Sequence, residues 1–231
     1  MHRIINIPCA FLLLAALLLL LPESSFAHNV ARADQSFLEQ NVGASVIPYM
    51  YLGAKHMVTG YDHLLYLAGI IFFLFRIREV AVFVSLFALG HSITLLFGVL
   101  GGWHVNPYLI DTIIGLSVAY KAFENLGGFK RCFGNWLDTR AAVFIFGLVH
   151  GLGLSSKLQD LTIAEEGLIY NIISFNVGVE IGQLVALAFL LTTFNLLRQS
   201  QHFQRKAIAA NIVLMSAGFL LMTYQFTAYL V

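Results

Sequence analysis

The sequence predicts an all-α membrane protein, a polytopic bundle of six transmembrane helices that follow a cleaved signal peptide. Hydrophobic residues make up 59% of the 231 residues and charged residues only 11%, with a mean hydropathy of +0.81. These values lie outside the range of soluble domains. Short links separate six apolar stretches, each near or above the length of about 20 residues that crosses a bilayer. They cover roughly residues 57–75, 80–100, 107–125, 140–158, 169–197 and 207–230.

Residues 1–27 have the pattern of a secretory signal peptide. A basic start at Arg3 precedes the apolar run Ala10–Leu21, Pro22 ends that run, and small residues precede a cleavage point after Ala27. The run is short for a span, which argues against the alternative, an uncleaved anchor helix. Cleavage would make His28 the mature amino terminus, where the amine and the imidazole together can chelate copper or nickel. A coincidental histidine is the simpler interpretation of this position.

The two cysteines exclude a thiolate-rich metal site and an intramolecular disulfide. Cys9 lies in the predicted signal peptide and would be removed with it, which leaves Cys132 alone. A metal site in the mature chain would therefore use nitrogen and oxygen ligands.

Residues 28–55 mix apolar and polar positions and are predicted to form a periplasmic segment with a short helix at the membrane surface. Tyrosines such as Tyr49 and Tyr51 favour that depth. The transmembrane domain is then expected to cover residues 56–231.

The distribution of lysine and arginine predicts the orientation of the bundle. A secreted amino terminus puts the links around 76–79, 125–140 and 198–206 in the cytoplasm. These links and the adjoining helix ends hold Arg76, Arg78, Lys121, Lys130, Arg131, Arg140, Arg198, Arg205 and Lys206. The exterior segments hold Arg32, Lys55 and Lys157. Because cytoplasmic segments are enriched in basic residues, we expect a protein of the bacterial inner membrane with both mature termini in the periplasm.

A histidine and aspartate element stands at the head of the first apolar stretch. His56, Asp62 and His63 are costly in a bilayer unless they face a partner, water or an ion. In one continuous helix the two histidines would lie roughly 10 Å apart, too far for a single ion whose bonds to imidazole are about 2 Å long. Either Gly60 breaks the helix and folds the pair together, or the two histidines mark successive stations on an inward path. Asp62 would orient His63 or face a neighbouring helix.

Further polar groups fall between the outer surface and the midplane of the predicted bundle. His91 and His150 lie near the middle of the second and fourth spans, which run in the same direction. Asn176, Glu180 and Gln183 are spaced to share one face of the fifth span. Glycines four residues apart in the fourth and fifth spans predict close packing that would bring His150 near this face. The inner half is expected to contain almost no polar group.

These side chains predict a site for a divalent transition-metal ion. Neutral imidazoles with one or two carboxylates suit nickel, cobalt or zinc, whereas magnesium and calcium prefer oxygen throughout. The predicted metal-binding residues are His56, Asp62, His63, His91, His150 and Glu180. Residues that would orient them or line the pathway are Asp111, Asn176, Gln183 and Ser92, with His28 as an additional amino-terminal candidate. Each group alone has a structural explanation, such as stabilisation of a helix amino terminus by Asp111. Several costly groups at similar depth are harder to explain separately.

Four sequence elements together resemble the HupE/UreJ family of bacterial membrane proteins. They are the His-x5-Asp-His element from His56 to His63, Gly90-His91-Ser92, Gly147-Leu-Val-His150-Gly151 and the stretch Phe175–Gln183. The likeness covers roughly residues 50–190, and the first element is moderately specific when the others accompany it. Members are associated with nickel or cobalt delivery for hydrogenase and urease. The resemblance therefore implies a secondary permease in which His56, Asp62 and His63 handle the ion.

One motif departs from the nickel permeases of that family. Those proteins carry a second motif of the form Phe-His-Gly-x-x-His-Gly-x-Glu, and the corresponding stretch here runs from Phe146 to Gly153. Only the later histidine, His150, is present, and the first histidine and the glutamate are glycine or shifted out of register. The chain therefore resembles the divergent second branch of the family.

Three functions fit the polar set. The favoured one is a permease that captures nickel or cobalt from the periplasm at a His/Asp/Glu cluster in the outer half of the bundle. The second is an intramembrane zinc hydrolase with Asp62 or Glu180 as general base and Ser92 nearby, although no His-Glu-x-x-His signature is present. The third is a haem-binding or assembly subunit with two membrane histidines as axial ligands. Such ligands must lie at equal depth, and His91 and His150 are the pair that meets this condition. The expected partners are the metal ion and the lipid bilayer, not nucleic acid, and the oligomeric state stays open.

Overall fold

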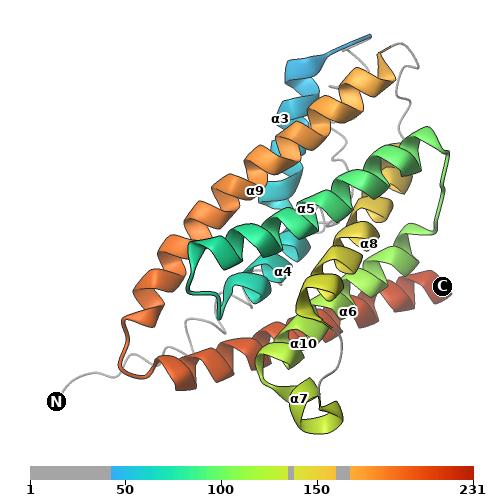
Figure 1. The fold of residues 1–231 in the computed structure, drawn as a ribbon. Helices are drawn as coiled ribbons and strands as arrows, with labels where there is room; N and C mark the ends of the chain where they lie inside the picture. Colours follow the sequence, from blue (N-terminus) through green and yellow to red (C-terminus); the bar gives the residue numbers. More distant parts are fainter. Residues whose placement is uncertain (1–42, 135–137, 160–166) are drawn as a thin grey trace.

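The structure is a computed structural model that describes residues 43–134, 138–159 and 167–231. Within these ranges every regular element is an α-helix, as predicted (Figure 1). The helices are α3 (Val46–Thr59), α4 (Tyr61–Ile71), α5 (Ile77–Leu100), α6 (Pro107–Asn125), α7 (Gly128–Phe133), α8 (Thr139–Gln159), α9 (Leu168–Arg198) and α10 (Phe203–Leu230). The predicted signal peptide, with Cys9, and His28 lie outside the described residues.

Four of the described helices, α5, α8, α9 and α10, are long and apolar enough to cross a membrane. The 19-residue α6 coincides with the predicted third span but carries Asp111, Lys121 and Glu124. The predicted first span is divided between two shorter helices, α3 and α4. The described part of the chain is therefore an all-helical, membrane-embedded bundle with four candidate spans, and the number of six crossings stays a prediction.

Gly60 divides the predicted first span. α3 ends one residue before Gly60 and α4 begins one residue after it, because Gly60 has an extended backbone with φ −72° and ψ 100°. Its N–H still donates to the carbonyl of His56 at 2.9 Å. α4 then starts as a new helix with Asp62 in its first turn, where a carboxylate is favoured by the helix dipole. Of the two arrangements that the sequence left open, the structure has the broken helix. α3 also crosses the boundary predicted at residue 55.

Glycines bring α3 against α9 and α5 against α8, and both pairs run parallel. A Cβ atom at Gly178 of α9 would overlap the backbone of Met50 in α3, and one at Gly147 of α8 would overlap the backbone of Phe87 in α5. Small residues commonly allow membrane helices to approach this closely. The close packing was predicted, but the partners were not. The glycines of α8 and α9 face α5 and α3 rather than each other.

α6 and α10 form a third close pair, which is antiparallel. Gly115 of α6 lies against Met222, and Gly218 of α10 lies against Ala119. The short α4 packs mainly on α6, and it also contacts α3, α9, α5 and α10. Because α4 touches helices of all three pairs, it is the central element of the bundle.

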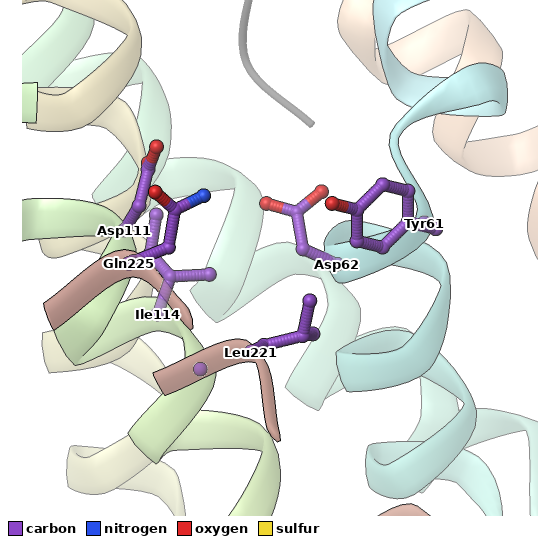
Figure 2. A pocket seen from close by; sticks show the side chains of 7 residues that line it. Tyr61, Asp62, Asp111, Ile114, Leu221 and Gln225 are labelled. Atoms are coloured by element: carbon purple, nitrogen blue, oxygen red, sulfur yellow. The ribbon is translucent and has the colours of Figure 1, made fainter. Parts of the chain in front are cut away.

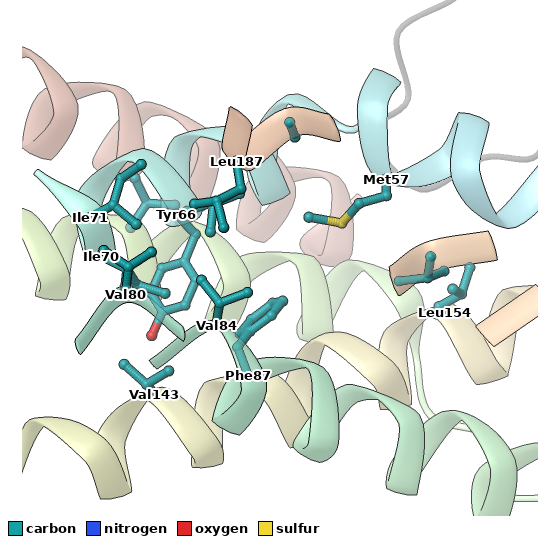
Figure 3. Packing of buried hydrophobic residues seen from close by; sticks show 14 of the residues in the cluster. Met57, Tyr66, Ile70, Ile71, Val80, Val84, Phe87, Val143, Leu154 and Leu187 are labelled. Atoms are coloured by element: carbon teal, nitrogen blue, oxygen red, sulfur yellow. The ribbon is translucent and has the colours of Figure 1, made fainter. Parts of the chain in front are cut away.

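The hydrophobic core surrounds α4. Tyr66, Ile70 and Ile71 are each at most 2% exposed. Figure 3 shows them beside Val80 and Val84 of α5. Since lipid is as apolar as these side chains, close packing rather than exclusion of water holds such helices together.

Arg198 holds the far end of α4. Its Nη2 donates to the carbonyls of Ile71 at 2.9 Å, Phe72 at 3.1 Å and Leu74 at 2.8 Å. The last carbonyls of a helix lack partners within the helix, and a cation is favoured near them. This basic residue at the end of α9 therefore fixes both the position and the termination of α4.

A polar network lies at the end of α6 that is predicted to face the cytoplasm. Lys121 is 7% exposed and donates to Glu124 at 2.6 Å, and Glu124 accepts a hydrogen bond from Thr139 at 2.5 Å. Asn125 donates to the side-chain oxygen of Asn211 at 2.9 Å. The expectation of an inner half almost without polar groups is therefore wrong. Asn125 and Asn211 are far apart in the sequence, and the packing of α6 against α10 brings them together. The packing of α6 against α8 likewise brings Glu124 to Thr139.

Candidate metal-binding site

Four histidine side chains meet in the interior, with His63 at the centre. Its ring centroid lies 5.1 Å from that of His56, 5.2 Å from that of His150 and 5.9 Å from that of His91. The four residues come from α3, α4, α5 and α8. The break at Gly60 allows His56 and His63 to approach, since a continuous helix would hold them two turns apart.

The histidine cluster, His56, His63, His91 and His150, is enclosed by the helices around it. His63 and His91 are each 1% exposed, His150 is fully buried and His56 is half-buried. A buried polar side chain costs free energy unless new partners replace its water. Apolar side chains would fill the same space without that cost, so the imidazoles indicate a function for their nitrogen atoms.

Contacts of Nδ1 orient two of the imidazoles. Nδ1 of His150 donates to the carbonyl of Phe146 at 2.7 Å, and Nδ1 of His63 lies 3.1 Å from Oδ1 of Asp62. In histidines that bind metals, a carbonyl or carboxylate commonly holds one ring nitrogen while the other ligates the ion. Nε2 of His150 is therefore the nitrogen that this ring can present to a metal ion, and Asp62 is positioned to orient His63.

Within the described ranges, His91 and His150 have ring nitrogens without a hydrogen-bond partner. Neither nitrogen of His91 makes a hydrogen bond there, and Nε2 of His150 makes none. Buried polar atoms in proteins are nearly always hydrogen-bonded, so exceptions call for an explanation. A bound cation would satisfy these lone pairs.

Phe87 and Tyr66 form an aromatic wall around the histidine cluster. The Phe87 centroid lies 5.0 Å from His150, 6.3 Å from His91 and 6.4 Å from His63, and Tyr66 lies 5.4 Å from His150. Such rings exclude water and strengthen electrostatic interactions inside the site. Phe87 was not among the predicted site residues. It is one of 20 phenylalanines, and its spacing of four residues from His91 is its one distinguishing signal.

In the described part of the chain, no group of three or more His, Cys, Asp or Glu side chains is already arranged to hold a metal ion. Each of the three separations from His63 is nevertheless short enough for that pair of rings to share an ion. A metal–imidazole bond of about 2 Å puts a ring centroid about 3 Å from the ion, so two ligating rings can lie up to about 6 Å apart. Side-chain rotation is therefore the smallest change that would turn the nitrogens toward one point.

Glu180 lies apart from the histidine cluster, in contrast to its predicted place in the site. It is exposed on α9, on the face opposite Gly178, which packs against α3. Asn176 is half-buried, whereas Gln183 is buried and donates to a carbonyl of α5 at 3.4 Å. The predicted polar face is thus divided between the surface of α9 and its contact with α5.

Asp111 forms an ion pair. Its Oδ2 accepts from Nζ of Lys157 at 2.8 Å, and both side chains are 10% exposed. The amino terminus of α6 is capped by Asn106, whose side chain accepts from the N–H of Tyr108 at 3.0 Å. Ser92, predicted to lie near the site, is half-buried on α5. Lys157 had no predicted role. Its position near the end of an apolar helix was the one signal in the sequence for a buried ion pair.

A small cavity lies between α4, α6 and α10. Its volume is about 10 Å³, roughly the space for one water molecule. It is lined by Tyr61, Asp62, Asp111, Ile114, Gly115, Leu221 and Gln225 (Figure 2). Asp62 therefore borders this cavity and also contacts His63.

Comparison with known proteins assigns the chain to a family. A family model described as HupE / UreJ protein matches residues 32–231, which include every described helix. No curated protein and no solved structure matches the chain. The chain therefore belongs to the HupE/UreJ family, which relates it to the transport of metal ions such as nickel or cobalt at membranes.

Proposed function

We propose that this protein is a permease for a divalent transition-metal ion, nickel or cobalt, and that the histidine cluster binds the ion during transport. The observation that carries the proposal is the convergence of buried imidazoles from α3, α4, α5 and α8 around His63. Imidazole nitrogens suit nickel and cobalt, whereas magnesium and calcium require oxygen ligands. The family relation supports the same conclusion.

Asp62 supplies negative charge to the proposed site. Neutral imidazoles alone would leave both charges of a dication uncompensated in a poorly solvated interior. The carboxylate of Asp62 is 2% exposed and touches His63, so it offsets part of that charge and orients the ring. The one carboxylate and the imidazoles together form a nitrogen-rich donor set for a borderline metal.

The helix pairs provide a way to release the ion. His56 belongs to the α3/α9 pair, His91 and His150 belong to the α5/α8 pair, and His63 lies on α4, which packs mainly on α6. Glycine contacts hold each pair together. A movement of one pair against the others would therefore separate the ligands. Rocking of helix units around a central site is a common transport mechanism.

Nickel uptake into proteoliposomes tests the proposal. We expect His63→Ala to reduce uptake to the level of protein-free liposomes, because this change removes the imidazole that contacts the other three. His202→Ala, at an exposed position before α10, is the matched control and should transport nickel like the unaltered chain. Size-exclusion chromatography and circular dichroism of both variants check that the bundle is folded.

Three outcomes would contradict the proposal. Equal uptake by His63→Ala and the unaltered chain would show that the ion crosses elsewhere. Stoichiometric zinc binding without ion movement would favour the intramembrane hydrolase. A Soret absorption band in the purified protein would favour the haem-binding or assembly function.

A further inference from the structure

The cavity between α4, α6 and α10 adjoins the histidine cluster and has a different set of donor atoms. Its lining includes the carboxylates of Asp62 and Asp111 and the amide of Gln225 (Figure 2). Carboxylate and amide oxygens are the ligands of hard divalent cations. The volume of about 10 Å³ admits one species the size of a water molecule or smaller.

Gln225 is the residue that indicates a ligand. It is 5% exposed, and Figure 2 shows its amide directed into the cavity, with the nitrogen on the side of Asp62. The amide makes none of the hydrogen bonds found among the described residues. An amide that lacks a protein partner depends on the species in the cavity for its hydrogen bonds. A cation bound to its carbonyl oxygen would provide that partner.

Lys157 places an ammonium group against one of the two carboxylates. Its Nζ donates to Oδ2 of Asp111 at 2.8 Å, and each side chain is 10% exposed. Lys157 lies on α8, the helix that carries His150, and it is close enough to His56 for an electrostatic interaction. The ammonium therefore neutralises Asp111 and repels any other cation that approaches the cavity.

Asp62 connects the cavity to the histidine cluster. One of its oxygens lies 3.1 Å from Nδ1 of His63, while the residue also lines the cavity. Asp111 is near enough to Asp62 and His63 to interact with both electrostatically. An ion held between the two carboxylates would therefore be next to the central imidazole.

We propose that the cavity is an outer cation-binding station, in which Asp62, Asp111 and Gln225 receive a divalent cation before it reaches His63, and that Lys157 competes with this cation for Asp111. The inference rests on the proposed transport function. A divalent ion that displaces the ammonium of Lys157 from Asp111 would be neutralised by the two carboxylates of the cavity.

Binding of Mn²⁺ tests this station separately from the histidine cluster. It is measured from the loss of the electron paramagnetic resonance signal of the free ion. All variants carry His63→Ala, and Mn²⁺ is used because it prefers oxygen ligands. We expect Lys157→Met to raise the Mn²⁺ affinity by about tenfold or more, the effect of removing one nearby positive charge from a partly screened site. Adding Asp111→Asn should abolish this gain. Lys157→Arg keeps the charge and is the matched control.

Equal Mn²⁺ affinities of the Lys157→Met and Lys157→Arg variants would overturn the inference, and so would a gain that persists after Asp111→Asn. If thermal unfolding shows that Lys157→Met is misfolded, Lys157→Gln makes the same charge change with a polar side chain, and the same criteria apply. Failure of the proposed function gives a different result. The unaltered chain would then show no nickel uptake, whatever the Mn²⁺ binding of these variants.

Discussion

His63 touches three imidazoles and one carboxylate, so its orientation decides what the site can bind. Asp62 holds Nδ1 of this ring from the neighbouring position in the first turn of α4. Partners of this kind fix the tautomer of a histidine and increase the basicity of the nitrogen that faces the metal. The strength of metal binding should therefore depend on the charge of Asp62 as well as on the imidazoles.

Asp62→Asn should lower the nickel affinity of the purified protein by about 10-fold to 100-fold, the usual cost of losing a carboxylate that supports a histidine ligand. Asparagine has nearly the same shape and can still accept from Nδ1, so the loss reports the missing charge. Isothermal titration calorimetry measures the affinity. Glu79→Gln, at an exposed position, is the matched control and should bind nickel like the unaltered chain. An unchanged affinity in Asp62→Asn would show that the carboxylate does not support the site.

For single residues, the sequence predicts which side chains are unusual better than it predicts the direction of each side chain. An imidazole in a membrane span is costly in any direction, so His91 and His150 could be singled out. The direction of Glu180 could not be predicted, because both faces of α9 are apolar. Ile181 is 43% exposed and Val179 is 4% exposed on the same turn. Hydrophobic periodicity therefore does not distinguish the lipid face from the interior.

Among the elements, the broken helix α3/α4 determines the geometry of the site. Gly60 fits between His56 and His63 because it has no side chain. A Cβ atom there would lie 3.0 Å from the carbonyl of His56 and 3.0 Å from Nδ1 of His63. These distances are shorter than ordinary van der Waals contacts, so a side chain at this position would require the His56 carbonyl or the His63 ring to shift by a few tenths of an ångström.

Gly60→Ala should therefore slow nickel uptake at least severalfold while the protein still inserts into membranes, since the added methyl displaces ligands and leaves the apolar spans unchanged. Uptake into proteoliposomes, normalised to the amount of inserted protein, measures the effect. Thr59→Ala is the matched control, because Thr59 is exposed and its hydroxyl donates only to the carbonyl of Lys55 in its own helix. Normal uptake by Gly60→Ala would mean that the spacing of His56 and His63 is not critical.

The sequence also predicts the limits of three long helices well, whereas α5 and α10 begin three and four residues before their predicted starts. The third, fourth and fifth predicted spans end within one residue of α6, α8 and α9, because Pro107 starts α6 and polar links separate the apolar runs. The pairing of these helices could not be predicted. A glycine such as Gly147 shows that some backbone comes close, but the same small surface fits many partners.

In the whole molecule, three tightly packed helix pairs surround α4, and the predicted orientation of this bundle rests on its basic residues. The link that contains α7 is predicted to be cytoplasmic. It carries the exposed thiol of Cys132, the one free cysteine in the described ranges. The protein therefore contains a natural reporter of its own orientation.

A membrane-impermeant maleimide should label Cys132 in inverted vesicles and leave it unlabelled in intact spheroplasts, because the reagent reaches the cytoplasmic side only in the former. Gel shift or mass spectrometry measures the modification. Cys132→Ser combined with His104→Cys moves the thiol to the exposed link between α5 and α6, and its labelling pattern should be the reverse. Labelling of Cys132 in spheroplasts would show that the bundle has the opposite orientation.

The aromatic ring of Phe87 has a mechanical consequence for ion exchange. It contacts three of the four imidazoles, at His63, His91 and His150. In a densely packed interior, one ring cannot turn unless its neighbours yield. A rotamer change at any of these histidines is therefore transmitted through the phenyl group to the other two. We therefore expect these three imidazoles to bind and release the metal ion together. States in which only one or two of them ligate the ion should be short-lived.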